Sequence, residues 1–150
     1  MWCPLLNTFV TYDANEYYFQ CAKTFGCAAP GMLKLHNEML QAPNCRTVKA
    51  MGRNVPLSAH ELALWEARVS LEAMLACNLA KFQQHKDCRQ WLLNTGNRPL
   101  IEHRRDPKWG DNLDGTGLNL LGKILEVVRA QATSWSGSSL HPSKKRQLTS

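Results

Sequence analysis

The sequence lacks the marks of a secreted, a metal-binding or a membrane-spanning protein. Its six cysteines include no C-x-x-C pair and no dense framework, so we expect reduced thiols and no disulfide scaffold. The five histidines are scattered at spacings that match no usual zinc-ligand pair, and neither a metal site nor a cofactor is expected. The first residues carry no basic leader, and no run approaches the roughly 18 to 20 apolar residues that span a bilayer. These absences predict a cytoplasmic protein without membrane contact.

Size and composition favour one compact domain with an anionic partner. A chain of 150 residues falls in the usual range for a single domain, and 44% hydrophobic residues can build a core. The formal charge of +6 suits nucleic acid or a phosphorylated small molecule, and it is equally compatible with a solvated basic surface. Half of that excess comes from Lys144, Lys145 and Arg146, in a segment rich in Ser and Lys. We expect residues 133–150 to be a disordered basic tail, the segment most suited to nucleic acid.

The first predicted helix covers residues 14–28. Asp13 and Glu16 have the spacing of a capping box, in which the first side chain caps the helix and the second bonds back. Residues at the spacing of one buried face are Tyr18, Cys21, Ala22 and Phe25. Glu16, Gln20 and Lys23 follow at i, i+4 and i+7 along a different, polar stripe. That stripe is available to a solvent-filled cleft.

The remaining periodic segments predict an α+β, predominantly helical fold. Helices are expected over 30–40 and 87–93, residues 47–52 are undecided, and residues 100–102 favour a short strand. The longest periodic segment, 59–84, begins with a second capping box at Ser58 and Glu61 and is apolar around much of its circumference. We expect it to be a buried central helix that forms scaffold and takes no part in a site.

Residues 106–122 form a stretch dense in glycine, aspartate and asparagine around Trp109. Residues 117–123 satisfy G-x-x-x-x-G-K, but a P-loop is rejected because Ile124 follows in place of Ser or Thr and no strong strand precedes Gly117. A calcium loop is rejected because the aspartates do not alternate and no glutamate follows at the right offset. A ligand-binding loop with an aromatic platform remains, and it leads into a helix ending near Gln131 whose N-terminus suits an anion.

Several sequence blocks resemble the NADAR (YbiA-like) family, in the same order and at similar spacing over roughly residues 13 to 130. Residues 15–23 look like the family's E-H-x-Y-Q-x-x-K helix, residues 51–53 like its M-G-R turn, and residues 81–82 like its K-F pair. Residues 92–96, 100–103, 106–111 and 117–122 look like its L-L-x-T-G, L-V-E, D-x-x-W-G and G-x-N-x-L-G blocks. Tyr17 stands where the family usually has His, and only fifteen residues precede Glu16 where relatives usually carry a few dozen.

The resemblance implies an α+β, mainly helical domain over residues 1–132 with a shortened N-terminus, and hydrolysis of an N-glycosidic bond. Some relatives remove phosphoribosyl groups from riboflavin-pathway intermediates, and others remove ADP-ribose from modified guanine. Breaking a ribosyl C–N bond builds positive charge on the sugar, so the reaction needs a nearby carboxylate and a positioned water. The resemblance assigns catalysis to Glu16, Trp109 and Asp111, and substrate binding to Tyr18, Gln20, Lys23, Arg53 and Asn119.

Each of these roles has a structural alternative in the residues alone. Glu16 can act only as a helix cap, and Trp109 as a core residue beneath a loop. Asp111 and Asn119 are common turn and cap residues. The alternative function is an N-terminally truncated, catalytically impaired nucleotide-binding or interaction module of the same fold.

Overall fold

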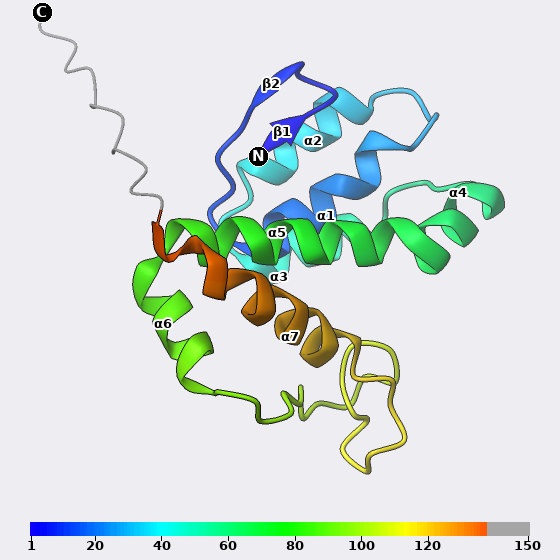
Figure 1. The fold of residues 1–150 in the computed structure, drawn as a ribbon. Coiled ribbons are helices and arrows are strands. Elements are labelled where there is room, and N and C mark those ends of the chain that lie inside the picture. The colour runs from blue at the N-terminus through cyan, green and yellow to red at the C-terminus, as the bar shows by residue number, and fades with distance from the viewer. Residues whose placement is uncertain (138–150) are drawn as a thin grey trace, which may run out of the picture.

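The computed structural model describes residues 1–137, and this part of the chain is predominantly helical with one small antiparallel ribbon (Figure 1). Strands β1 (Trp2–Cys3) and β2 (Thr8–Phe9) pair with Trp2 opposite Phe9. The helices are α1 (Asn15–Phe25), α2 (Met32–Leu40), α3 (Cys45–Arg53), α4 (Ala59–Leu64), the π-helical turn η1 (Trp65–Val69), α5 (Ser70–Gln84), α6 (Lys86–Asn94), α7 (Leu120–Ala132) and the 3-10 helix η2 (Thr133–Gly137). The predicted α+β, mainly helical class is confirmed, and the undecided residues 47–52 are helical.

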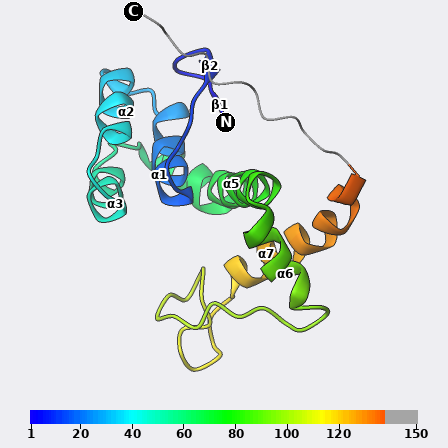
Figure 2. The same cartoon turned by 90° about the vertical axis from the view of Figure 1, so that its left-hand side faces the viewer.

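Helix α5 lies between two groups of helices, as predicted for a central helix (Figure 2). On one side α1, α2 and α3 pack against one another, and on the other side α6 and α7 do so. Both α1 and α7 contact α5 directly. Because α1 carries Glu16 and α7 follows the Trp109 loop, α5 holds these two parts of the predicted site in fixed relation.

Helix α1 is shorter and more deeply buried than the sequence predicts. The predicted capping box at Asp13 is wrong, because the N-cap residue is Ala14 and no side chain caps the helix. Of the predicted buried face, Cys21 and Ala22 are buried, but Tyr18 and Phe25 are only partly buried. Burial also extends to other residues, since α1 packs against α2, α3 and α5 at once. Its buried residues are Tyr17, Phe19, Gln20, Cys21, Ala22 and Thr24.

The predicted helix over residues 59–84 is continuous from α4 through η1 to α5. Its capping box is confirmed: the Glu61 amide donates to Ser58 Oγ at 3.3 Å, and the Ser58 amide donates to Glu61 Oε2 at 2.6 Å. The prediction that this whole helix is buried is wrong, because its end near α4 extends beyond the helices packed on α5 (Figure 1). Exposed apolar residues there are Leu62, Leu64 and Val69. The expectation of scaffold alone is also wrong, because Trp65, Glu66 and Ser70 line the cleft described below.

The strand predicted at residues 100–102 is wrong, because β1 and β2 are the strands found in residues 1–137. The 100–102 backbone instead bonds to side chains of α7 and its cap. The amide of Leu100 donates to Glu126 Oε1 at 2.8 Å, and the amide of Glu102 donates to Asn119 Oδ1 at 2.9 Å. The Leu100 and Glu102 amides thus have side-chain partners, and the Glu102 carbonyl accepts the Asp111 amide at 3.0 Å, so these groups are satisfied without a neighbouring strand.

Three of the four glycines of the 106–122 stretch, Gly110, Gly117 and Gly122, allow close backbone packing. A Cβ on Gly117 would meet the Gly110 carbonyl and the Asp111–Asn112 backbone, and one on Gly122 would meet the Leu100 carbonyl. Only a residue without a side chain fits where two backbones approach so closely. The G-x-x-x-x-G-K pattern therefore reflects packing, in agreement with the rejection of a P-loop.

The C-terminal residues are described only in part. The predicted tail begins at Thr133, where η2 continues from α7, and Trp135 packs against the cluster of Phe82, Leu92 and Val128. The remainder of the predicted tail lies outside the described residues. Among residues 1–137, every helix is too short or too polar to cross a membrane.

Candidate active site

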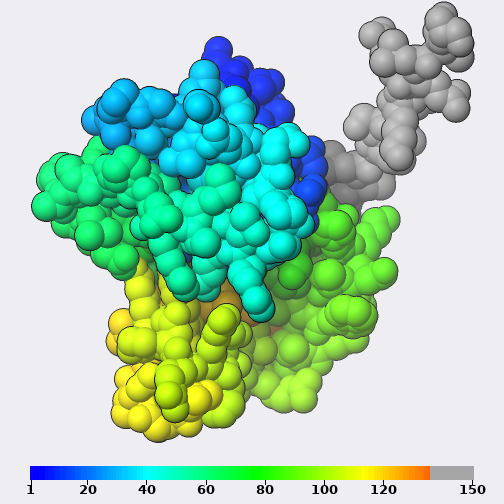
Figure 3. Space-filling model, turned by 180° about the vertical axis from the view of Figure 1, so that it is seen from behind, coloured from blue at the N-terminus to red at the C-terminus, as the bar shows by residue number. Residues whose placement is uncertain are grey.

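A cleft of about 380 Å³ lies between the two groups of helices. Its lining residues come from α1, α3, the η1–α5 segment, the loop before α7 and the first turn of α7. Figure 3 shows this hollow between the surface near residue 50 and the loop near residue 110, with α7 behind it. The lining residues are Glu16, Phe19, Gln20, Lys23, Lys49, Arg53, Trp65, Glu66, Ser70, Met74, Glu102, Arg104, Asp106, Lys108, Trp109 and Leu121.

The cleft brings together five of the eight residues that the sequence assigns to the site. Those five are Glu16, Gln20, Lys23, Arg53 and Trp109, from three segments far apart in the chain. The polar stripe of α1 thus faces the cleft. Tyr18, Asp111 and Asn119 are not among its lining residues.

The Glu16 carboxylate is held by its neighbour one helical turn away. Gln20 Nε2 donates to Glu16 Oε1 at 2.7 Å, and Gln20 itself is only 3% exposed. Gln20 packs against Gly52 on α3, where any Cβ would overlap its side chain. The M-G-R block, which forms the end of α3, therefore has a glycine because α3 closes over Gln20, and Gln20 in turn orients the Glu16 carboxylate.

Three aromatic rings form one wall of the cleft. Phe19 on α1 stands edge-on to Trp65, with ring centroids 5.1 Å apart, and to Trp109, with centroids 5.6 Å apart. Asp106 Oδ1 accepts the backbone N–H groups of Lys108 at 3.0 Å and Trp109 at 2.9 Å. This side-chain turn fixes the direction in which Trp109 leaves the loop.

Two lysines of the cleft have internal partners. Lys23 Nζ donates to the Gly52 carbonyl at 2.9 Å and lies 5.4 Å from the Trp65 ring centroid, and burial lowers its pKa. Lys108 Nζ pairs with Glu66 Oε2 at 2.5 Å and donates to Ser70 Oγ at 3.1 Å. These contacts join the loop and α1 to the segment around η1.

The remaining cations of the cleft are available to a ligand. Lys49, Arg53 and Arg104 have no acidic partner within residues 1–137. No group of His, Cys, Asp and Glu in the same residues could hold a metal ion. The cleft therefore combines four acidic residues (Glu16, Glu66, Glu102 and Asp106) with a ring wall and three positive charges that have no acidic partner in this part of the chain. Glu66 is paired with Lys108 and Asp106 accepts backbone N–H groups, so the three cations remain free to bind an anionic organic molecule.

Asp111 and Asn119 hold the loop that carries Trp109. Asp111 Oδ2 lies 2.8 Å from His103 Nδ1, and its Oδ1 accepts the Leu113 amide at 2.9 Å. These hydrogen bonds lower the pKa of Asp111, that from His103 first. Asn119, at a φ of 50°, accepts from the Glu102 amide and donates to the Leu100 carbonyl at 2.8 Å.

Asn119→Ala is expected to destabilise the folded protein by about 1–3 kcal/mol, because it leaves a partly buried amide and carbonyl without partners. Since Asn119 is not among the cleft residues, KM for substrate should change little at temperatures where the variant is folded. Thermal unfolding and steady-state kinetics measure the two effects. Asn97→Ala is the control, because Asn97 is an exposed turn residue without a positive φ, and it should change neither stability nor KM. A raised KM with unchanged stability would instead place Asn119 on the substrate.

Sequence reasoning missed several residues of the cleft. Lys49 precedes Arg53 by four residues, so the helical spacing of α3 could have placed both on one face. Glu66 and Ser70 could not be found, because a π-helical turn shifts the residues that follow it around the helix axis. Arg104 lies in irregular chain, where no periodicity predicts which way a side chain points.

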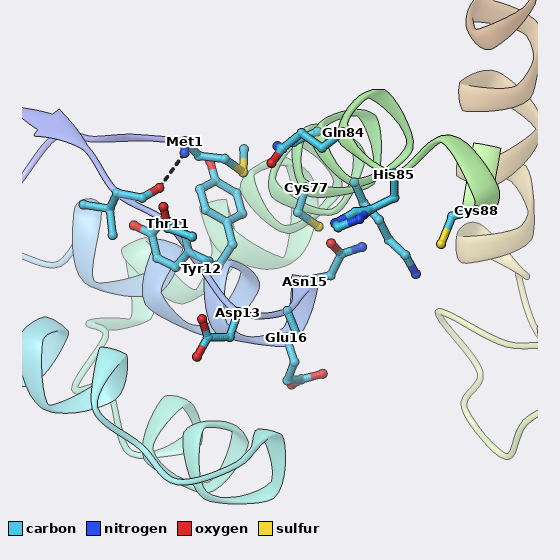
Figure 4. A pocket seen from close by; sticks show the side chains of 15 residues that line it. Met1, Thr11, Tyr12, Asp13, Asn15, Glu16, Cys77, Gln84, His85 and Cys88 are labelled. Atoms are coloured by element: carbon cyan, nitrogen blue, oxygen red, sulfur yellow. Dashed lines mark hydrogen bonds between the residues drawn. The ribbon is translucent and has the colours of Figure 1, made fainter. Parts of the chain in front are cut away.

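A larger hollow of about 470 Å³ lies between the N-terminal segment and the end of α5 (Figure 4). The ammonium group of Met1 donates to the Val10 carbonyl at its edge at 2.6 Å, and Tyr18 is among its lining residues. Figure 4 shows the Glu16 side chain turned away from Cys77 and His85. Glu16 therefore lines both cavities, whereas Tyr18 lines the larger hollow and not the 380 Å³ cleft.

Comparison with known proteins identifies the family and supports the fold. Residues 4–132 match the profile of the NADAR domain. The chain belongs to the NADAR family. Within this family it is 34% identical over 124 residues to the N-glycosidase YbiA of Shigella boydii serotype 4, covering 81% of this chain and 71% of that protein. The NMR structure of the Escherichia coli protein YbiA superimposes with a TM-score of 0.69 at 30% identity, over 89% of this NADAR chain and 74% of the other.

A further NADAR relative carries a different name. The Riboflavin biosynthesis protein VVA0006 of Vibrio vulnificus (strain YJ016) is 28% identical over 134 residues, which are 86% of this chain and 33% of that protein. The NADAR resemblance seen in the sequence blocks is confirmed. The match includes both segments that face the cleft, α1 and the Trp109 loop.

Proposed function

We propose that this chain is a hydrolase that cleaves the N-glycosidic bond of an anionic riboside, either a phosphoribosylated compound like a riboflavin intermediate or an ADP-ribosylated guanine. The observation that carries the proposal is the Glu16 carboxylate in a cleft that also holds Lys49, Arg53 and Arg104 without acidic partners among residues 1–137. Relatives named N-glycosidases support the class of reaction. The name of the Vibrio vulnificus relative supports a riboflavin-type substrate.

The reaction breaks the bond between the ribosyl C1 atom and the base nitrogen. The bonding electron pair leaves with the nitrogen, so positive charge builds on C1 and the ring oxygen. A carboxylate at Glu16 stabilises that charge and accepts a proton from the attacking water, whose oxygen forms the new bond to C1. The proton then passes to the leaving nitrogen. Free base and a sugar with a hydroxyl at C1 result, and no cofactor is consumed.

The other residues act by binding and positioning. Trp109 packs against the sugar or base, and Lys23 and Arg53 face the phosphate. Gln20 orients the carboxylate through its hydrogen bond to Glu16. Asp111 and Asn119 contribute by holding the Trp109 loop.

Product analysis tests the proposal. The purified protein is incubated with a phosphoribosylamino-pyrimidine and with an ADP-ribosylated guanine nucleotide, and released base and sugar phosphate are quantified by chromatography. Catalytic release of base from either compound supports the proposal and identifies the substrate class. A folded protein that binds these compounds without releasing base would instead be a nucleotide-binding module of the same fold.

Arg53→Ala is expected to raise KM for the phosphorylated substrate by about tenfold or more with a smaller change in kcat, because it removes a charge-assisted contact to the phosphate. Arg46→Ala is the matched control, since Arg46 lies on the same helix α3, is exposed and does not line the cleft. Steady-state kinetics with each variant measure the effect. Equal KM values for the two variants would show that Arg53 does not contact the phosphate.

A further inference from the structure

A smaller hollow of about 290 Å³ continues the cleft beyond Glu16. The two cavities share the lining residues Glu16, Phe19, Met74 and Leu121. The smaller hollow is also lined by residues that the cleft lacks: Asn15, Asn78, Lys81, Phe82 and Leu125, of which Asn15 and Lys81 line the 470 Å³ hollow too. These five residues come from the start of α1, from α5 and from α7, and α5 contacts both of the other two helices. The function proposed above assigns no part of the substrate to this hollow.

The carboxylate separates two chemically different ends of the combined cavity. Lys23 lies seven residues after Glu16 on α1, which is about 10 Å along a helix axis at 1.5 Å per residue. The unpaired cations Lys49 and Arg53 lie on α3, which packs beside this part of α1. Asn15 lies in the opposite direction, at the first residue of α1. The Asn15 end has one cation, Lys81, which is exposed and lies 5.4 Å from the Phe82 ring centroid. A molecule spanning both ends therefore has its anionic group near Lys23, where the cations gather, and its less charged part near Asn15.

The smaller hollow has the surface that a flat heterocycle requires. Phe19, Phe82 and Leu125 offer apolar surface to the faces of a ring. Asn15 Nδ2 donates to Asn78 Oδ1 at 3.0 Å, and Asn78 Nδ2 donates to the Met74 carbonyl at 2.8 Å. Asn78 is 4% exposed, so this pair of amides is fixed in place. Asn15 Oδ1 has no hydrogen-bond donor within residues 1–137 and can accept an N–H from the edge of a ring.

We propose that this hollow is the subsite for the leaving base, and this rests on the hydrolase function proposed above. The substrate lies along α1 with its phosphate at Lys23 and Arg53, its C1 atom at Glu16 and its base between Phe82 and Leu125. Asn15 Oδ1 accepts a hydrogen bond from an amino or ring N–H of that base. Trp109, which does not line this hollow, then packs against the sugar.

Leu125→Trp and Val127→Trp test the assignment as a matched pair. Leu125 lines the hollow, whereas Val127 lies two residues further along α7, about 200° around the axis, and is 47% exposed. Binding of free diaminouracil, free guanine and ribose 5-phosphate is measured by equilibrium dialysis. Leu125→Trp is expected to weaken binding of the preferred base by roughly tenfold or more, because the indole fills the space, and to leave ribose 5-phosphate within about twofold. Val127→Trp should change neither the binding of the base nor that of ribose 5-phosphate.

Asn15→Ala keeps the assignment testable if the larger side chain at 125 prevents folding. This substitution leaves the apolar side chains that line the hollow in place. It is expected to weaken base binding several-fold while ribose 5-phosphate binds as before. Base binding that is unchanged in both folded variants, or absent from the unmutated protein, would overturn the subsite. Turnover that is absent while base binding follows Leu125 would instead refute the hydrolase and leave a base-binding hollow.

Discussion

Glu16→Gln is expected to lower turnover of the anionic riboside by about 10²- to 10⁴-fold, the usual contribution of a positioned acid–base group. The substitution removes the negative charge that opposes the developing charge on C1 and the site that accepts the water's proton. It keeps the size of the side chain and an oxygen that can accept the hydrogen bond from Gln20 Nε2. Folding should therefore be retained, and the loss should appear in kcat more than in KM.

The measurement is steady-state release of base, with thermal unfolding recorded for every variant. Glu38→Gln is the matched control, because it is the same chemical change at an exposed residue of α2 whose one ion pair among residues 1–137 is with Lys34. It should retain full turnover. Hydrolysis at the unmutated rate by a folded Glu16→Gln variant would remove the carboxylate from the mechanism and leave the interpretation of Glu16 as a residue of the first helical turn.

Gly52→Ala is expected to destabilise the protein by about 1–3 kcal/mol and to lower turnover as well. An added Cβ would overlap the Gln20 side chain, which is buried between α1 and α3 and cannot move away freely. Displacing Gln20 breaks its hydrogen bond to Glu16, so the effect reaches the carboxylate. Gly26→Ala is the control, since nothing lies within 4 Å of a Cβ there, and it should change stability by no more than about 0.5 kcal/mol.

The double variant Gly52→Ala with Gln20→Ala separates packing from positioning. Removing the Gln20 side chain relieves the overlap, so stability should recover toward that of Gln20→Ala alone, a non-additive result in thermal or denaturant unfolding. Turnover should stay low, because the carboxylate still lacks its donor. Recovery of both stability and turnover would mean that Gln20 only fills space, and purely additive losses would mean that the two residues do not collide.

The first helix shows what a short sequence pattern could and could not predict. The i, i+4, i+7 spacing of Glu16, Gln20 and Lys23 places them on one stripe in any α-helix, and the cleft contains all three. The predicted cap of this helix was wrong, because Asp13 has the right spacing but Ala14 is the N-cap residue and the helix begins at Asn15. Burial of Gln20 depends on Gly52, a residue of another helix, which the spacing within α1 does not contain.

The long helix and the loop show the same division. A capping box at Ser58 and Glu61 is a local contact, so the start of α4 followed from four consecutive residues. A 3.6-residue periodicity does not predict the π-helical turn that begins at Trp65. This turn places Glu66 and Ser70 against Lys108 of the loop. The strand predicted at residues 100–102 is not formed. The Leu100 and Glu102 amides bond instead to the side chains of Glu126 and Asn119, which are distant in sequence.

By itself, the sequence determined the helical class, the order of the helices, the family blocks and the polar stripe of α1, because each depends on residues within a few turns of one another. Only the tertiary structure decided which charges meet. It brought Arg53 and Trp109 to Glu16, gave Lys108 an acidic partner and left Lys49, Arg53 and Arg104 without one among residues 1–137. Those pairings depend on distances between segments that the chain folds together, and no local spacing encodes such distances.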